Sequence, residues 1–111
     1  MAEIVKGEHH FEIEKLSPAK VAAVSALMER RGIRVAVADA TLHGSVEFQA
    51  ELARACVSSW TDGNGFDFKK LSSKEQVELL KSRKKVTSWI VAQASKLADA
   101  EDKEFDEDSG N

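Results

Sequence analysis

Histidine, cysteine and grouped carboxylates are the side chains in this sequence that could bind a metal ion or act in catalysis. His9 and His10 are adjacent, with Glu8 and Glu12 nearby. Neighbouring side chains on a strand point to opposite faces, so the two imidazoles are not expected to hold one ion. The single cysteine, Cys56, falls on the apolar face of a predicted helix, where a thiol behaves as a small apolar group. We therefore predict no metal site, no cofactor and no enzymatic activity.

The segment 62–67, DGNGFD, alternates oxygen-bearing side chains as the opening of a calcium loop does. A calcium loop ends on a glutamate at its twelfth position, which is Ser73 when the count starts at Asp62. Lys69 and Lys70 would also repel the ion. Asp-Gly and Asn-Gly pairs accept positive φ angles. The segment is therefore predicted to be a turn.

A basic run at residues 81–85 is the feature most suited to nucleic acid. Its cationic side chains are Lys81, Arg83, Lys84 and Lys85. Such a local field attracts phosphates even on an acidic protein. No aromatic residues are interleaved with the run, so a solvated connection between helices is the competing interpretation.

Two tryptophans, Trp60 and Trp89, are the largest apolar side chains in the chain. Tryptophan is more often a core residue than a platform for a ligand. It is also enriched among the residues that anchor protein interfaces. We therefore expect one of the two to face a partner protein.

A β-hairpin and a helix are predicted for the N-terminal third. Alternation favours pairing of Glu3–Val5 with His10–Glu14 around a turn at residues 6–8, and such a hairpin needs a helix beneath it. Ser17-Pro18 begins a helix that runs to about Arg31, with Gly32 as its C-terminal cap. Residues 33–38 suit a short third strand or an extended connection.

Three more helices are predicted after residue 44. The second runs from Ser45 to about Ser59, before Trp60. Its inward residues are Phe48, Leu52, Ala55 and Cys56, and its outward residues are Glu47, Glu51 and Arg54. A capping box at residues 72–75 begins the third, which ends near Lys81. The fourth resumes at Val86, so the basic run is either a tight bend or a solvated helix face.

Length and composition support one domain, and the predicted elements place it in the α+β class, mainly α with a small N-terminal β-hairpin and about four helices. The chain has 111 residues, of which 42% are hydrophobic and 32% charged. Residues 99–108 hold seven acids and one lysine, a charge of −6, so the rest of the chain carries +3. We predict a domain over residues 1–98 and a disordered acidic tail over 99–111. The absence of long apolar runs and of a signal-peptide pattern disfavours membrane insertion and secretion.

Three stretches together resemble the tail assembly chaperones of long-tailed bacteriophages. They are Phe11-x-Ile13-x-x-Leu16-Ser17-Pro18, the run from Leu52 to Trp60 with its Asp-Gly turn, and Leu71–Gln76 followed by Leu79-Leu80 and Trp89-Ile90. The likeness is one of layout over residues 10–105. It consists of a short β element, a helix, a junction with tryptophan and a glycine-bearing turn, a helix pair and a charged end.

The resemblance implies a non-enzymatic protein of the host cytoplasm that binds the tape measure protein, keeps it soluble and helps tail tube subunits assemble around it. Nucleic acid and membrane are not expected as its partners. The sequence is compatible with either a monomer or a homo-oligomer. From the apolar pattern we expect the binding surface to include Trp60, Leu80, Trp89 and Ile90. The alternatives are another phage structural or head–tail completion protein, and a small nucleic-acid-binding or regulatory domain that uses the basic run.

Overall fold

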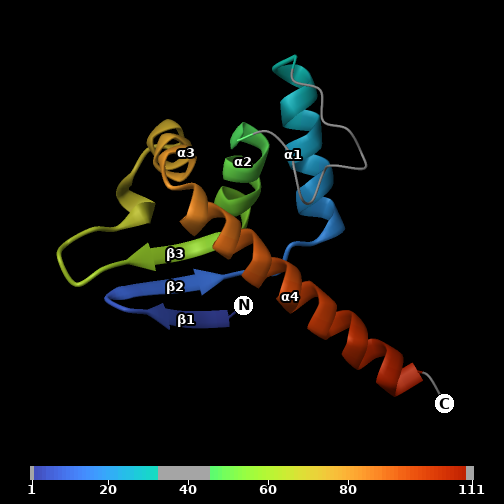
Figure 1. Cartoon of the computed structure of the whole chain (residues 1–111). Helices are drawn as coiled ribbons and strands as arrows, with labels where there is room; N and C mark the ends of the chain where they lie inside the picture. Colours follow the sequence, from blue (N-terminus) through green and yellow to red (C-terminus); the bar gives the residue numbers. More distant parts are fainter. Residues whose placement is uncertain (1, 33–45, 110–111) are drawn as a thin grey trace.

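Figure 1 shows a three-stranded sheet covered on one face by helices, in a computed structural model that describes residues 2–32 and 46–109, with side chains described through Glu101. In chain order the elements are β1 (Ala2–Lys6), β2 (His9–Ile13), α1 (Pro18–Arg30), α2 (Val46–Cys56), β3 (Val57–Thr61), the 3-10 helix η2 (Phe68–Lys70), α3 (Ser73–Ser82) and α4 (Lys84–Ser109). The prediction of a mainly helical α+β domain with a small N-terminal β element is confirmed. No helix among the described residues is long and apolar enough to cross a membrane.

The predicted N-terminal hairpin is present with the expected pairing. Val5 lies opposite His10, and Lys6 lies opposite His9 at the turn. Gly7 occupies this turn with a φ of +63°, a conformation that glycine adopts without steric cost. The register places Lys6 and His9 on the same face of the sheet, because directly opposed residues in an antiparallel pair share a face.

The sheet has a third strand where the sequence predicted helix. The helix α2 ends at Cys56 rather than near Ser59, and Val57–Thr61 forms β3, antiparallel to β2. Trp60 lies opposite Phe11 in this pairing. β-branched and aromatic residues favour strands, and the pairing with β2 overrides the helical pattern that the segment shares with α2. The alternative third strand, predicted at residues 33–38, lies outside the described residues.

Helices α1 and α3 begin as predicted. The Ser17 hydroxyl accepts a hydrogen bond from the Lys20 backbone N–H at 3.2 Å, and proline occupies the first turn of α1. At α3, both halves of the capping box between Ser72 and Glu75 are formed. Serine caps of this kind typically contribute about 1 kcal/mol each.

The basic run at residues 81–85 is a bend rather than a continuous helix face. Arg83 leaves the helical conformation, with φ −118° and ψ 71°, and α4 begins at the next residue. The buried Thr87 hydroxyl donates to the Leu80 carbonyl oxygen at 2.6 Å and lies 3.0 Å from the Arg83 carbonyl oxygen. These contacts tie the first turn of α4 to the last turn of α3 and so fix the angle between them.

The helix α2 lies at the centre of the molecule, in contact with α1, α3, α4 and β3. It is therefore buried on more than one stripe, and the core includes Phe48, Ala50, Leu52, Ala53 and Cys56 from this helix alone. The prediction that Glu51 points outward was wrong, since its side chain is 4% exposed. Its carboxylate lies 3.9 Å from the Arg31 guanidinium, which offsets part of the cost of burying a charge.

The helix α4 is longer than the sequence predicted, because its backbone stays helical through Ser109. The acidic segment from Asp99 onward therefore continues the helix, where the pattern indicated a disordered tail. The segment contains glutamate and alanine, which are good helix formers, beside aspartates, which are not, and a helix that is already nucleated extends at little cost. The Lys15 ammonium also pairs with the Glu101 carboxylate at 2.7 Å, which attaches this part of α4 to the chain after β2. Figure 1 shows the C-terminal part of α4 extending away from the sheet.

Candidate binding groove

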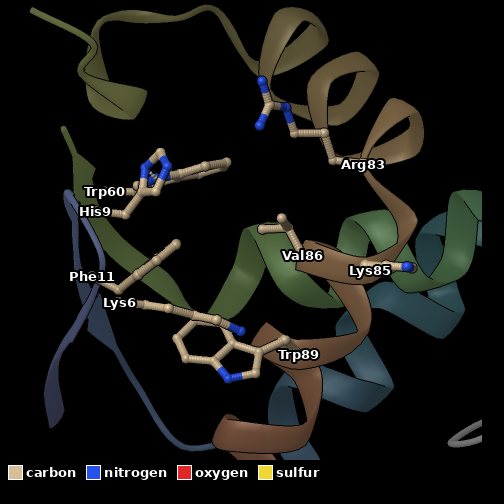
Figure 2. A pocket seen from close by; sticks show the side chains of 8 residues that line it. All are labelled: Lys6, His9, Phe11, Trp60, Arg83, Lys85, Val86 and Trp89. Carbon is tan, nitrogen blue, oxygen red and sulfur yellow. Dashed lines mark hydrogen bonds between the residues drawn. The ribbon is translucent and has the colours of Figure 1, made fainter. Parts of the chain in front are cut away.

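A hollow of about 170 Å³ lies between the sheet, at the end that holds the β1–β2 turn, and the first turns of α4. We call it the Trp89 groove, and Figure 2 shows its lining. The sheet contributes Lys6, His9, Phe11 and Trp60, and the α3–α4 corner and α4 contribute Arg83, Lys85, Val86 and Trp89. Strand register and the α3–α4 bend together bring these residues side by side from three separate parts of the sequence.

Aromatic rings in contact with one another form the floor of the groove. The Phe11 ring lies 5.1 Å from the Trp60 ring, centroid to centroid, and 4.9 Å from the Trp89 ring. Behind the floor, the Phe66 and Phe68 rings pack on Trp60 at 4.9 and 5.6 Å. Aromatic pairs at these separations add about 0.5–1.5 kcal/mol each beyond the area that they bury. The floor is therefore a rigid extension of the core.

His9 is held in one orientation by Trp60. The Trp60 indole Nε1–H donates to His9 Nδ1 at 3.2 Å. Because Nδ1 is the acceptor, the proton of the neutral imidazole lies on Nε2. This bond satisfies the indole N–H, which would otherwise lose its hydrogen bond on burial.

Cations surround the groove. The Lys6 ammonium lies 4.7 Å from the centre of the Trp89 ring, within the range of a cation–π contact. The Arg83 guanidinium extends toward the side of His9, whereas the Lys85 ammonium points away from the sheet (Figure 2). Among the residues that line the groove there is no carboxylate, and within the described side chains none of these three cations forms an ion pair. The charged side chains that line the groove are therefore all cations.

Three of the four residues predicted to bind a partner lie in the core. Leu80 and Ile90 are fully buried, and Trp60 is 2% exposed. Trp89 is half-buried and borders the groove, so it is the one of the four that can meet a partner in this conformation. Apolar spacing along a helix does not distinguish a residue facing the core from one facing a partner, which explains why all four matched the pattern.

The basic run divides between two environments. The Lys81 ammonium pairs with the carboxylates of Glu47 and Glu78 at 3.4 and 3.6 Å. Arg83 and Lys85 line the groove, and Lys84 is exposed at the start of α4. The sequence shows no aromatic residues within the run, but in the fold Arg83 and Lys85 line the same hollow as the Phe11, Trp60 and Trp89 rings.

Sequence reasoning missed Lys6, His9, Phe11 and Val86 as groove residues. Part of a signal existed in the hairpin, because continuing the predicted pairing by one residue on each strand places Lys6 and His9 on the same face as Phe11. The pairing does not say which helix covers that face. This choice depends on the α3–α4 bend, which the sequence left open.

A second hollow, of about 550 Å³, lies among residues of α1, α2 and α3 and differs in its charges. Its carboxylates face its cations, as in the pairs of Arg31 with Glu51 and of Lys81 with Glu47. The Arg54 guanidinium donates to side-chain oxygens of residues 76 and 73 at 3.0 and 2.7 Å. Within the described residues this hollow therefore presents no cluster of unpaired like charges.

The other candidate chemical groups are engaged in the fold. Burial raises the pKa of the Cys56 thiol to about 11, so the thiolate needed for nucleophilic chemistry is scarce at neutral pH. The carboxylate of Asp62 accepts hydrogen bonds from the backbone N–H groups of Asn64 and Phe66 at 2.8 and 3.0 Å, which lowers the pKa of Asp62. The carboxylate thus closes the predicted turn. No group of three or more metal-ligating side chains occurs in the described part of the chain.

Comparison of the chain with known protein families, with curated proteins and with solved structures gave no match. The function proposed below therefore rests on the geometry of the Trp89 groove and on the resemblance in layout. Neither depends on a residue correspondence with another protein.

Proposed function

We propose that this protein is a non-enzymatic phage tail assembly chaperone that binds the tape measure protein through the Trp89 groove in the host cytoplasm. The observation that supports the proposal is the groove itself, in which an aromatic floor is surrounded by cations with no carboxylate among its lining residues. Such a surface suits a polypeptide segment that carries an apolar side chain next to acidic ones.

The tape measure protein is a client with matching chemistry. Long coiled helices expose an apolar stripe before assembly, and an amphipathic helix binds by laying that stripe into an apolar groove. The half-buried Trp89 ring would anchor the apolar residue, while Lys6 and Arg83 would pair with flanking carboxylates. A single groove of this size gives modest affinity. Several copies along one client would raise the total through multivalency.

The residues that carry the resemblance also support the groove as the site. Phe11 comes from the first resembling stretch, Trp60 from the second and Trp89 from the third. Their side chains lie within one aromatic cluster, with Phe11 in contact with both tryptophans. The pattern in the sequence and the groove in the structure therefore involve the same three rings.

Co-expression with a tape measure fragment tests the proposal. The fragment is a coiled-coil segment of a phage tape measure protein, and we expect this protein to raise its soluble yield and to purify with it. Trp89→Ala should abolish both effects. Val5→Ala is the matched control, because Val5 is 58% exposed and lies one residue from Lys6 in β1, on the opposite face of the sheet. Loss of rescue with Val5→Ala as well, or no rescue by the natural chain, would count against the proposal.

Mass spectrometry of finished particles separates the chaperone from a structural role. A chaperone is expected to be absent from purified virions. A head–tail completion or other structural protein would be present at a fixed number of copies. Detection at such a stoichiometry would replace the chaperone proposal by the structural one.

Single-stranded nucleic acid is the second candidate ligand, favoured by the presence of Arg83 and Lys85 in the lining of the hollow that the Trp89 ring also borders. Cations that follow a phosphate backbone and aromatic rings that stack on bases are the usual elements of such sites. A mobility shift that weakens steeply with salt, and that is lost in Arg83→Ala with Lys85→Ala, would support this candidate. Binding of the tape measure fragment with no such shift would exclude it.

A further inference from the structure

The charges on α4 are opposite to those that stabilise a helix. Its first turn contains Lys84 and Lys85 and no acid, and its last turn contains no base. The helix dipole favours acids near the N-terminus and bases near the C-terminus. In this chain the acidic residues are instead at the C-terminal end, with seven of them in 99–108. The arrangement therefore lowers the stability of α4 rather than raising it.

The two charged ends of α4 cannot meet within one molecule. The helix is continuous from Lys84 to Ser109, and its C-terminal part extends away from the sheet in Figure 1. Trp89 and Asp99 are separated by ten residues, which corresponds to about 15 Å along a helix axis. A continuous helix holds them apart. An acidic segment that reaches the groove must therefore belong to another molecule.

We propose that the Trp89 groove binds the acidic end of α4, residues 102–108, from a second copy of this chain. That segment carries five acids and one lysine, a net charge of −4. The groove offers Lys6 and Arg83, with Lys85 at its outer rim, and has no carboxylate among its lining residues. Contact between the ends of two α4 helices neutralises both sets of charges that the helix dipole disfavours. The inference depends on the charges of this chain and not on the identity of the client.

The contact is head to tail, since each copy has one groove and one acidic end. Heterologous contacts of this kind either close into a ring or continue as an open chain. Self-association should therefore grow with protein concentration. It should also weaken with salt, because the screening length falls from about 10 Å at 0.1 M to about 3 Å at 1 M ionic strength. An acidic client segment would compete with the second copy for the same groove.

Two full-length variants test the proposal by complementation. The groove variant is Arg83→Glu with Lys85→Glu. The end variant is Glu104→Gln, Asp106→Asn, Glu107→Gln and Asp108→Asn, which keeps the side-chain sizes. In sedimentation at low salt, the natural chain should self-associate and each variant alone should stay monomeric. An equimolar mixture of the two should form a heterodimer, because one supplies an intact groove and the other an intact acidic end.

The controls separate this contact from a general effect of charge. Arg30→Glu with Lys74→Glu makes the same change in net charge at two exposed residues outside the groove, and it should leave self-association unchanged. Raising the salt to about 1 M should weaken the heterodimer by at least about tenfold, which corresponds to about 1.4 kcal/mol. Circular dichroism of each variant establishes that it is folded before its mass is interpreted.

Several results would overturn the inference. A natural chain that stays monomeric at low salt would do so, as would a mixture of variants that forms no heterodimer. So would a monomer that binds a single-stranded oligonucleotide through the groove in place of a second copy. Client binding is measured separately with the tape measure fragment. Failure of self-association therefore leaves the proposed function standing, and failure of client binding leaves the self-association standing.

Discussion

Trp60 and Trp89 contact the same ring, yet they have different roles in the molecule. Phe11 lies 5.1 Å from Trp60 and 4.9 Å from Trp89. Trp60 is 2% exposed, donates its indole N–H to His9 and is packed by two further phenylalanines. Trp89 is half-buried, with the Lys6 ammonium over its ring. The first side chain completes the core, whereas the second lies at the half-buried edge of the same aromatic cluster and borders the groove.

Replacement of Trp60 should have the largest effect on stability. Trp60→Ala removes a buried ring from the centre of four aromatic contacts, and truncations of this kind cost about 3–5 kcal/mol. Urea denaturation followed by circular dichroism measures the loss in the free energy of unfolding. A cost below about 1 kcal/mol would mean that the ring is not part of a packed core.

Replacement of Trp89 should cost about half as much, because its ring is only half-buried. We expect Trp89→Ala to lower the free energy of unfolding by about 2 kcal/mol. The same denaturation experiment measures it, and Lys6→Ala isolates the cation–π contact, for which about 0.5–1 kcal/mol is expected at an exposed site. If Trp89→Ala costs as much as Trp60→Ala, the distinction between core and groove fails.

The smallest effect is expected at Asp62, whose turn holds Phe66 against Trp60. The pKa of Asp62 is lowered in the folded state by the hydrogen bonds from the Asn64 and Phe66 backbone N–H groups. A lowered pKa contributes stability that is present above the unfolded-state pKa and is lost as the pH falls through the folded-state pKa. Asp62→Asn should therefore lower the Tm at neutral pH and match the natural chain in strong acid. A Tm difference that persists unchanged at low pH would show that the charge is not the cause.

Local signals predicted the beginnings of elements better than their ends. Ser17-Pro18 and the capping box at residues 72–75 located the starts of α1 and α3, because a cap depends on neighbouring backbone N–H groups. The end of α2 was placed too late, since the pairing of β3 with β2 decides it from a distance in the sequence. Glu51 was placed outward for a similar reason, because a one-stripe pattern does not describe a helix with neighbours on several sides.

The sequence by itself determined the α+β class, the two segments that pair in the hairpin, the starts of the capped helices and the opposite charges at residues 81–85 and 99–108. These features follow from local backbone preferences and from composition. Only the tertiary structure decided that Trp60, Leu80 and Ile90 are core residues and that Trp89 borders a groove with Lys6 and Arg83. The physical reason is that burial depends on which elements pack together. That packing was fixed by the β2–β3 pairing and by the bend at Arg83, neither of which has an unambiguous local signal.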